Sequence, residues 1–168
     1  MSSSTAEPSE ITAAVVTVSD SSSRGEREDR SGPAVSQFLE KLHFKVVARE
    51  IVPDDSIQIQ NLLIRLSREV RLIVTTGGTG IAPRDETPEA TIAVCDRLLP
   101  GVAELMRAEG KKKTPFAVLS RGVCGVRGRA LILNLPGSPK GAVESLESVA
   151  ALMPHALDLL AGKTEHKS

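Results

Sequence analysis

The chain has 168 residues, a length that suits a single domain with a sizeable hydrophobic core. Its 21 basic and 21 acidic side chains cancel, and aromatic residues make up only 2% of the sequence. Nucleic-acid binding needs basic patches or aromatic stacking platforms, so this composition argues against that class of partner. No apolar segment reaches the ~20 residues of a membrane-spanning helix, so we expect no membrane partner.

Short polar segments flank the predicted domain, which covers residues 11–162. Residues 1–10 lack the apolar region of a signal peptide and are predicted to be a disordered tail, and residues 163–168 are predicted to be a second tail. Cys95 and Cys124 are not in CxxC spacing. Without an export signal, we expect reduced thiols and a cytoplasmic location.

Strands and helices alternate in the first half of the sequence. The β-branched apolar run at residues 11–19 predicts a buried strand, and a polar loop follows it at residues 20–32. A helix with one apolar face then leads into a second strand at residues 44–52, which Pro53 ends. Another helix of this kind precedes a third strand at residues 71–76.

The second half continues this alternation. The predicted elements are helices at residues 87–99 and 102–110, strands at residues 115–120 and 130–135, and a last helical stretch from residue 142 that Pro154 interrupts. Alternating strands and helices predict a three-layer α/β/α sandwich with a mostly parallel sheet. Parallel sheets bind ligands at the carboxyl ends of their strands, so the loops after the strands are expected to meet at one edge.

The segment TTGGTGIAPRDETPEAT, at residues 75–91, directly follows the third predicted strand. Its glycines Gly77, Gly78 and Gly80 let backbone N–H groups approach an anion without obstruction by a Cβ atom. The segment has neither the spacing of a P-loop nor that of a dinucleotide-binding loop. The glycines therefore indicate either an anion site or a tight strand-to-helix turn.

Two acids stand at the carboxyl ends of predicted strands. Asp54 follows the second strand, and Asp85 follows Arg84 just before a predicted helix. Each acid is a possible Mg²⁺ ligand, because Mg²⁺ prefers hard oxygens and takes one or two protein carboxylates. Each can also cap a helix, the more common role of an acid at such a position, and Asp85 can instead pair with Arg84. Asp55 can cap the same helix as Asp54.

Further polar residues share the predicted edge. Acids and hydroxyls of the first loop can grip a ribose or only stabilise a turn, and arginines near residue 120 can bind phosphate or lie on the surface. The Pro-Gly-Ser turn after the last strand can hold a ligand or simply precede a helix. These residues are Asp20, Asp29, Ser31, Ser120, Arg121, Arg127 and residues 136–138.

The order of these motifs resembles that of the molybdenum cofactor biosynthesis family, which includes the molybdopterin adenylyltransferases and the G domain of gephyrin. The matching stretches span about residues 12–160 and include TVSDSSSRGEREDRSGP, IVPDD, the glycine segment, LSRGVCGVRGRALILNLPGSPKG and PHALDLL. GGTG, PRDxTPEAT and NLPGS in this order are specific to the family.

The resemblance implies a MogA/MoaB-like fold, a homotrimer and an enzymatic function. Enzymes of the family transfer AMP from ATP to the terminal phosphate of molybdopterin with Mg²⁺ as cofactor, giving adenylyl-molybdopterin and pyrophosphate. The alternative is a molybdopterin-binding carrier of the same family without catalytic activity. No molybdate-insertion domain is recognisable in the chain, so that later step is expected of a separate protein.

The resemblance also implies roles for individual residues by their motif positions. It assigns catalytic and metal-binding roles to Asp54 and Asp85. It assigns nucleotide binding to Asp20, Asp29 and Ser31. The implied molybdopterin-binding residues are Thr76, Gly77, Gly78, Thr79, Gly80, Ser120, Pro136, Gly137 and Ser138.

Overall fold

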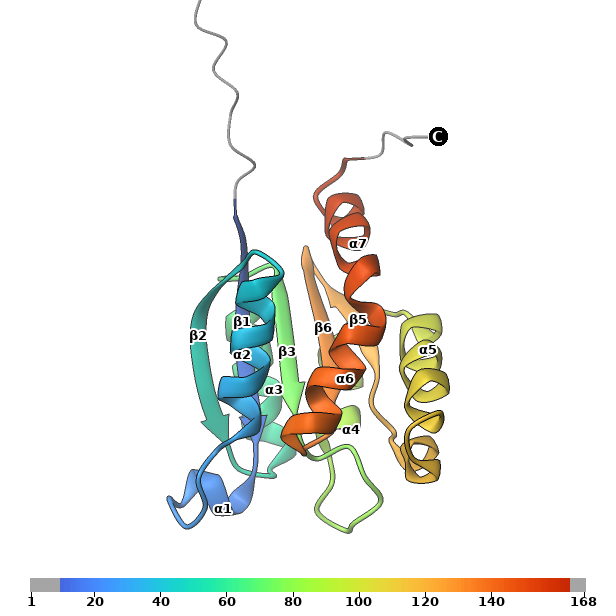
Figure 1. Cartoon of the computed structure of the whole chain (residues 1–168). Helices are drawn as coiled ribbons and strands as arrows, with labels where there is room; N and C mark the ends of the chain where they lie inside the picture. The colour runs from blue at the N-terminus through green and yellow to red at the C-terminus, as the bar shows by residue number, and fades with distance from the viewer. Residues whose placement is uncertain (1–9, 164–168) are drawn as a thin grey trace, which may run out of the picture.

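The computed structural model describes residues 10–163, so most of both predicted tails lies outside the described residues (Figure 1). The strands of this part of the chain are β1 Ile11–Val18, β2 Phe44–Val52, β3 Leu72–Thr76, β4 Arg97–Leu98, β5 Cys124–Arg127 and β6 Ala130–Leu135. They form one sheet in the order β2-β1-β3-β6-β5-β4. The first four strands in this order run parallel, and β5 and β4 continue the sheet in antiparallel pairing. The predicted mostly parallel sheet is therefore confirmed.

Helices cover both faces of the sheet and complete the predicted three layers (Figure 1). One face carries α2 Ser31–Lys41, α5 Pro100–Lys111, α6 Pro139–Val149 and α7 Met153–Leu160. The other face carries α3 Ser56–Ser67 and α4 Thr87–Val94. The short helical turns are α1 Asp20–Ser23, η1 Pro115–Leu119 and η2 Ala150–Leu152. Within residues 10–163, no helix has the length and apolarity that crossing a bilayer requires.

Two hydrophobic cores, one on each face, explain why the central strands are apolar throughout. Successive side chains of a strand point to opposite faces, so Val15 packs into the core under α2 and α6 while Val16 packs into the core under α3 and α4. Val74 and Ile73 of β3 divide in the same way. A strand that is buried on both faces has no polar alternation, which is typical of parallel sheets.

One strand predicted for the second half is wrong, and the strand β5 was not predicted. Residues 115–120 form the 3₁₀ helix η1 rather than a strand, because the Thr114 hydroxyl accepts a hydrogen bond from the Phe116 N–H and starts a helical turn at Pro115. Phe116 is 75% exposed, so the apolar run does not mark a buried strand. The segment expected to connect two strands instead contains β5, a strand of four residues that pairs with β6; the glycines of this segment weaken its strand signal.

The first loop and the helix predicted from Thr87 also differ from expectation. The first turn of the polar loop forms α1, because Ser19 caps it by accepting a hydrogen bond from the Ser22 N–H. The helix from Thr87 ends at Val94 rather than near residue 99. Cys95 turns to an extended conformation, and the next residue donates its N–H to the carbonyl of Val126, so the chain leaves the helix to pair with β5.

The loops after β1, β2, β3 and β6 all leave the sheet at its carboxyl edge, the lower edge in Figure 1. The buried side chain of Asn134, near the end of β6, ties this edge together. Its amide nitrogen donates to the hydroxyls of Thr75 and Thr91 at 3.0 Å each, and its amide oxygen accepts from the Val123 N–H at 3.1 Å. One side chain thus joins β3, α4, β6 and the segment before β5.

Replacing Asn134 by leucine should destabilise the fold measurably. Asn134→Leu leaves buried hydroxyls and the Val123 N–H without this partner, and an unpaired buried polar group costs about 1–3 kcal/mol, so the free energy of unfolding should fall by at least ~2 kcal/mol. Urea unfolding followed by circular dichroism measures the change. Asn61→Leu, the same substitution at an exposed position of α3, should shift stability by no more than about 0.5 kcal/mol. Equal effects of the two changes would contradict this role.

Candidate functional site

Two adjoining cavities open at the carboxyl edge of the sheet, each with a volume of about 750 Å³. The first, which we name the apolar cavity, lies beside α5, η1 and α6 and is lined by side chains such as Met106, Phe116 and Leu119. The second, the polar cavity, is lined by serines, arginines and acids of the first loop together with Asp54. The linings of both cavities share Gly77, Gly78, Asp85, Gly137 and Ser138, which we name the shared wall.

The glycine segment after β3 forms a tight turn in this wall. Gly77 and Gly78 have φ angles of 91° and 70°, which a residue with a side chain rarely adopts. The Thr87 hydroxyl donates to the Gly77 carbonyl at 3.0 Å, and the Thr87 N–H donates to the Gly78 carbonyl at 3.2 Å. A Cβ atom at Gly78 would collide with the Thr87 hydroxyl. The turn itself therefore requires these glycines. The Gly77 N–H already donates to the Leu135 carbonyl, so it is not available to an anion.

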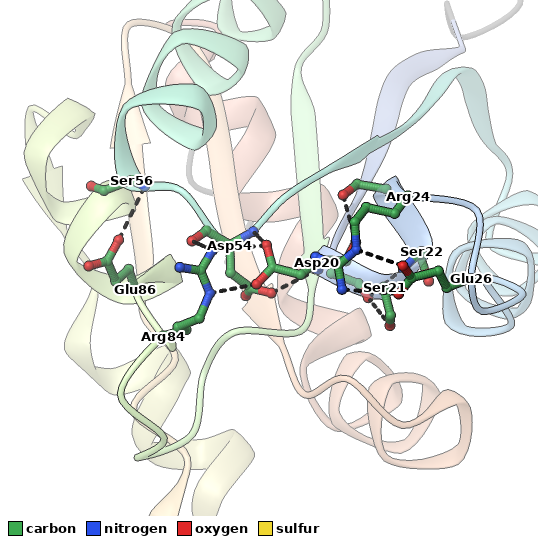
Figure 2. Close-up of polar contacts among 11 residues, drawn as sticks. Asp20, Ser21, Ser22, Arg24, Glu26, Asp54, Ser56, Arg84 and Glu86 are labelled. Carbon is green, nitrogen blue, oxygen red and sulfur yellow. Dashed lines mark hydrogen bonds and ion pairs between the residues drawn. The ribbon is translucent and has the colours of Figure 1, made fainter.

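Asp54 and Asp20 hold each other through reciprocal hydrogen bonds (Figure 2). The Asp20 N–H donates to Oδ2 of Asp54, and the Asp54 N–H donates to Oδ1 of Asp20, each at 3.0 Å. Arg84 donates to both oxygens of Asp20, at 2.6 and 3.0 Å, and to the carbonyl of Asp54 at 3.1 Å. Arg84 thus pairs with Asp20 rather than with Asp85, the alternative that the sequence left open, and this guanidinium holds the pKa of Asp20 below its usual value.

The structure separates the roles of the neighbouring acids Asp54 and Asp55. Asp55 caps α3 by accepting a hydrogen bond from the Gln58 N–H at 2.9 Å, so it fills the capping role that either acid could have taken. Asp54 faces the polar cavity instead. Burial raises the pKa of Asp54, the N–H of Asp20 opposes this rise, and the negative charges of Asp20 and Asp85 add to it.

Asp85 lines both cavities and does not cap α4. Its Oδ2 accepts from the Ala82 N–H at 2.9 Å, within its own loop. The N-cap position of α4 belongs to Glu86, whose side chain instead accepts from the Ser56 N–H at 3.2 Å. Both acids that the resemblance singles out thus line the cavities, and neither caps a helix: Asp55 caps α3, and α4 has no side-chain cap.

The predicted nucleotide-binding residues are engaged in bonds within the protein. Asp29 accepts from the Thr17 hydroxyl at 2.7 Å and from the Gly32 N–H at 3.0 Å. The Ser31 hydroxyl lies 2.9 Å from that of Thr76. Asp29, Ser31 and Thr76 line the polar cavity. Asp20 is absent from the described linings of both cavities and contacts the site through Asp54.

The predicted molybdopterin-binding residues line the apolar cavity, except Thr76, which lines only the polar cavity. Ser138 caps α6 by accepting from the Gly141 N–H at 3.1 Å, so its turn does precede a helix while it also lines both cavities. Arg127 points elsewhere, donating to the Val94 carbonyl at 2.8 Å. Besides Ser138, the predicted molybdopterin-binding residues that line the apolar cavity are Gly77, Gly78, Thr79, Gly80, Ser120, Pro136 and Gly137.

Two residues of the apolar cavity were missed by sequence reasoning. Arg107 of α5 lines this cavity and is held by the carbonyls of Ser120 and Gly122 at 3.3 and 3.0 Å. An arginine in an amphipathic helix carries no signal that separates it from a solvated one. Asn134 did carry a signal, because it is the single polar residue in the apolar run ALILNL.

The carboxylates of Asp54 and Asp85, which both line the polar cavity, fit a hard divalent cation that also binds substrate oxygens. Oδ1 of Asp54 and Oδ1 of Asp85 have no hydrogen-bond partner within residues 10–163. The described residues contain no cluster of three or more His, Cys, Asp or Glu side chains suited to a metal. Mg²⁺ is commonly held by one or two protein carboxylates, with water and phosphate oxygens as its other ligands.

Comparison with known proteins agrees with this geometry. A family model described as a probable molybdopterin binding domain matches residues 14–155. A molybdopterin adenylyltransferase of Helicobacter pylori strain J99 is 45% identical over 88% of this chain and 86% of its own length. The molybdopterin adenylyltransferase of Escherichia coli strain K12 is 40% identical over 88% of this chain and 84% of its own length.

Solved structures give the same result. The molybdopterin biosynthesis enzyme MoaB of Thermus thermophilus is 54% identical, with a TM-score of 0.84, and the match covers 91% of this chain and 98% of that one. The expected MogA/MoaB-like fold is thereby confirmed. Sequence and fold agree over most of the chain, and the chain belongs to the molybdopterin-binding family of molybdenum cofactor biosynthesis proteins.

Proposed function

We propose that this protein transfers AMP from ATP to the terminal phosphate of molybdopterin, giving adenylyl-molybdopterin and pyrophosphate. The observation that carries this proposal is the shared wall, because a reaction between two substrates needs two sites that meet at one place. The names of the relatives from Helicobacter pylori and Escherichia coli support the same activity.

In this proposal each substrate occupies one cavity. Molybdopterin lies in the apolar cavity, whose mixture of apolar side chains and a few polar groups suits a planar heterocycle. ATP lies in the polar cavity, where Arg27 and Arg30 supply positive charge for its phosphates and Ser22 supplies a hydroxyl. The phosphate of molybdopterin and the α-phosphate of ATP then meet at the shared wall.

The proposed reaction needs no general base. A phosphate monoester has a second pKa near ~6, so the terminal phosphate of molybdopterin is mostly dianionic at neutral pH. One of its oxygens forms a bond to the α-phosphorus, and the bond from that phosphorus to the bridging oxygen breaks. Pyrophosphate leaves with the electron pair. The barrier comes from repulsion between polyanions, so catalysis consists of alignment and charge neutralisation.

Asp54 and Asp85 are the residues that would hold Mg²⁺ in this reaction. When bound, Mg²⁺ neutralises phosphate charge and stabilises the charge that develops on the leaving group. The bonds to Asp20 keep the carboxylate of Asp54 directed toward the polar cavity, while Arg84 balances the charge of Asp20. Carboxylates beside phosphates without a cation would only add repulsion, which argues for a metal-binding role.

Removing either negative charge should abolish most transfer without unfolding the protein. An amide oxygen can still accept from the N–H of Asp20 or of Ala82, so Asp54→Asn and Asp85→Asn should keep the fold. We expect pyrophosphate release to fall by about 100-fold, a size typical for loss of an electrostatic group. Binding of molybdopterin should change little, and excess Mg²⁺ or Mn²⁺ should restore part of the activity.

Asp55→Asn is the matched control, because asparagine caps a helix as well as aspartate does. It should leave both pyrophosphate release and the melting temperature near those of the unchanged protein. Normal turnover of both Asp54→Asn and Asp85→Asn at ordinary Mg²⁺ would refute the metal-binding role. Molybdopterin binding without any pyrophosphate release by the unchanged protein would favour the carrier function instead.

We propose a homotrimer in the cytoplasm, with molybdate inserted by a separate protein. The family relationship and exposed apolar side chains, such as Val47 and Ile51 on the edge strand β2, support self-association. The free cysteines Cys95 and Cys124 suit a reducing compartment.

Light scattering at micromolar concentration tests the assembly directly. We expect a particle with three times the 17.8 kDa mass of the chain. A particle with the mass of a single chain would refute the trimer, and it would leave the proposed chemistry to be judged by pyrophosphate release alone.

A further inference from the structure

Arg121 joins the segment after η1 to the loop that carries Asp85. Its backbone N–H donates to the Thr79 carbonyl at 2.8 Å, and its Nε donates to the Gly80 carbonyl at 2.8 Å. Its Nη2 donates to the Asp85 carbonyl at 2.8 Å. The planar guanidinium therefore bridges the two ends of the turn from Gly80 to Asp85, a geometry that a single ammonium group cannot reproduce.

The carboxylate of Asp85 depends on the shape of this turn. Within the turn, Asp85 donates its N–H to the Ala82 carbonyl and accepts the Ala82 N–H on Oδ2, each at 2.9 Å. The carboxylate lies over Gly80, because a Cβ atom placed on Gly80 would be only 2.8 Å from Oδ2 of Asp85. The distance between the backbones of Gly80 and Asp85 thus determines where this carboxylate can lie.

Arg121 contacts the loop of the shared wall but does not line either cavity. Its neighbours Ser120 and Gly122 line the apolar cavity, whereas Arg121 is not among the described lining residues of either cavity. Its Nη1 pairs with the carboxylate of Glu89 on α4, which anchors the guanidinium to a helix. All three guanidinium nitrogens of Arg121 are bonded within the protein, so this side chain holds the loop in place.

The same loop is held from its other side by Arg84. That guanidinium bonds the carboxylate of Asp20 and the carbonyl of Asp54 (Figure 2). Arg84 and Asp85 are adjacent in the chain, so one arginine ties the loop to the elements after β1 and β2. Arg121 ties it to the elements before β5. Asp85 is therefore positioned relative to Asp54 by two separate clamps.

We infer that Arg121 is a positioning residue that sets the place of the Asp85 carboxylate in the shared wall. Its consequence for a divalent cation held by Asp54 and Asp85 rests on the proposed function, whereas its effect on the loop does not. Loss of a group that orients a metal-binding side chain commonly weakens metal binding or activity by about 10- to 100-fold.

The test compares Arg121→Met, Arg121→Lys and the control Arg71→Met. Arg71 also bonds two backbone carbonyls, those of Arg129 and Leu157 at 3.2 and 3.0 Å, but it lies at the start of β3 on the opposite edge of the sheet. Hydrogen exchange of the peptide 78–86 is measured by mass spectrometry in the protein alone. The Mg²⁺ dependence of pyrophosphate release is measured with ATP and molybdopterin.

For Arg121→Met we expect faster exchange in peptide 78–86 and a half-saturating Mg²⁺ concentration raised about 10- to 100-fold. The KM for molybdopterin should change much less. Arg121→Lys keeps the charge opposite Glu89 but cannot bridge two carbonyls, so it should resemble Arg121→Met. Arg71→Met should lower the melting temperature while leaving loop exchange and Mg²⁺ dependence unchanged.

Three results would overturn the inference. Unchanged exchange and unchanged Mg²⁺ dependence in Arg121→Met would remove the positioning role. Full restoration by Arg121→Lys would show that charge, and not the bridge between Gly80 and Asp85, is what the loop needs. Equal loop exchange in Arg71→Met would show a general loss of stability. If the unchanged protein releases no pyrophosphate, the proposed function fails, and the exchange data still decide the role of Arg121.

Discussion

The buried amide of Asn134 is the contact on which the site depends. A buried amide group is costly unless its donors and acceptor are paired, so Thr75, Thr91 and the Val123 N–H must stay within reach of β6. The Thr91 hydroxyl in turn donates to the Thr87 carbonyl at 2.8 Å, so the first turn of α4 is also tied to Asn134. The loops after β3 and β6, which supply the residues shared by both cavities, begin just after Thr75 and Asn134, so this buried network holds that part of the polar site in place.

The wall between the cavities is made mostly of backbone, and this makes it thin. Gly77 donates to the Leu135 carbonyl at 3.1 Å, and a Cβ atom at Gly137 would lie 3.4 Å from the Cα of Gly77. The loops after β3 and β6 therefore touch without side chains between them. Groups in the two cavities can therefore approach each other closely across this wall. Bulkier residues in the wall would keep them apart.

The sheet and the location of the site were predictable because both follow from local patterns. β1, β3 and β6 are mainly apolar runs and β2 is rich in Val and Ile, and their alternation with helices implies parallel strands with loops at one edge. Local pattern failed at η1 and β5. The apolar run at residues 115–119 has no period that separates a strand from a helical turn, and β5 becomes a strand only because β6 offers it hydrogen bonds.

By itself, the sequence determined the alternation of the parallel strands with helices, the shared edge and the motifs that place this chain in its family. Only the tertiary structure decided which acid caps α3 and which lines the polar cavity. Asp54 and Asp55 are chemically identical neighbours, and they differ because Asp55 meets the N–H of Gln58 while Asp54 meets that of Asp20, 34 positions away. Arg84 likewise pairs with Asp20 rather than with adjacent Asp85. Hydrogen bonds and ion pairs depend on distance in space, which residue spacing along the chain does not contain.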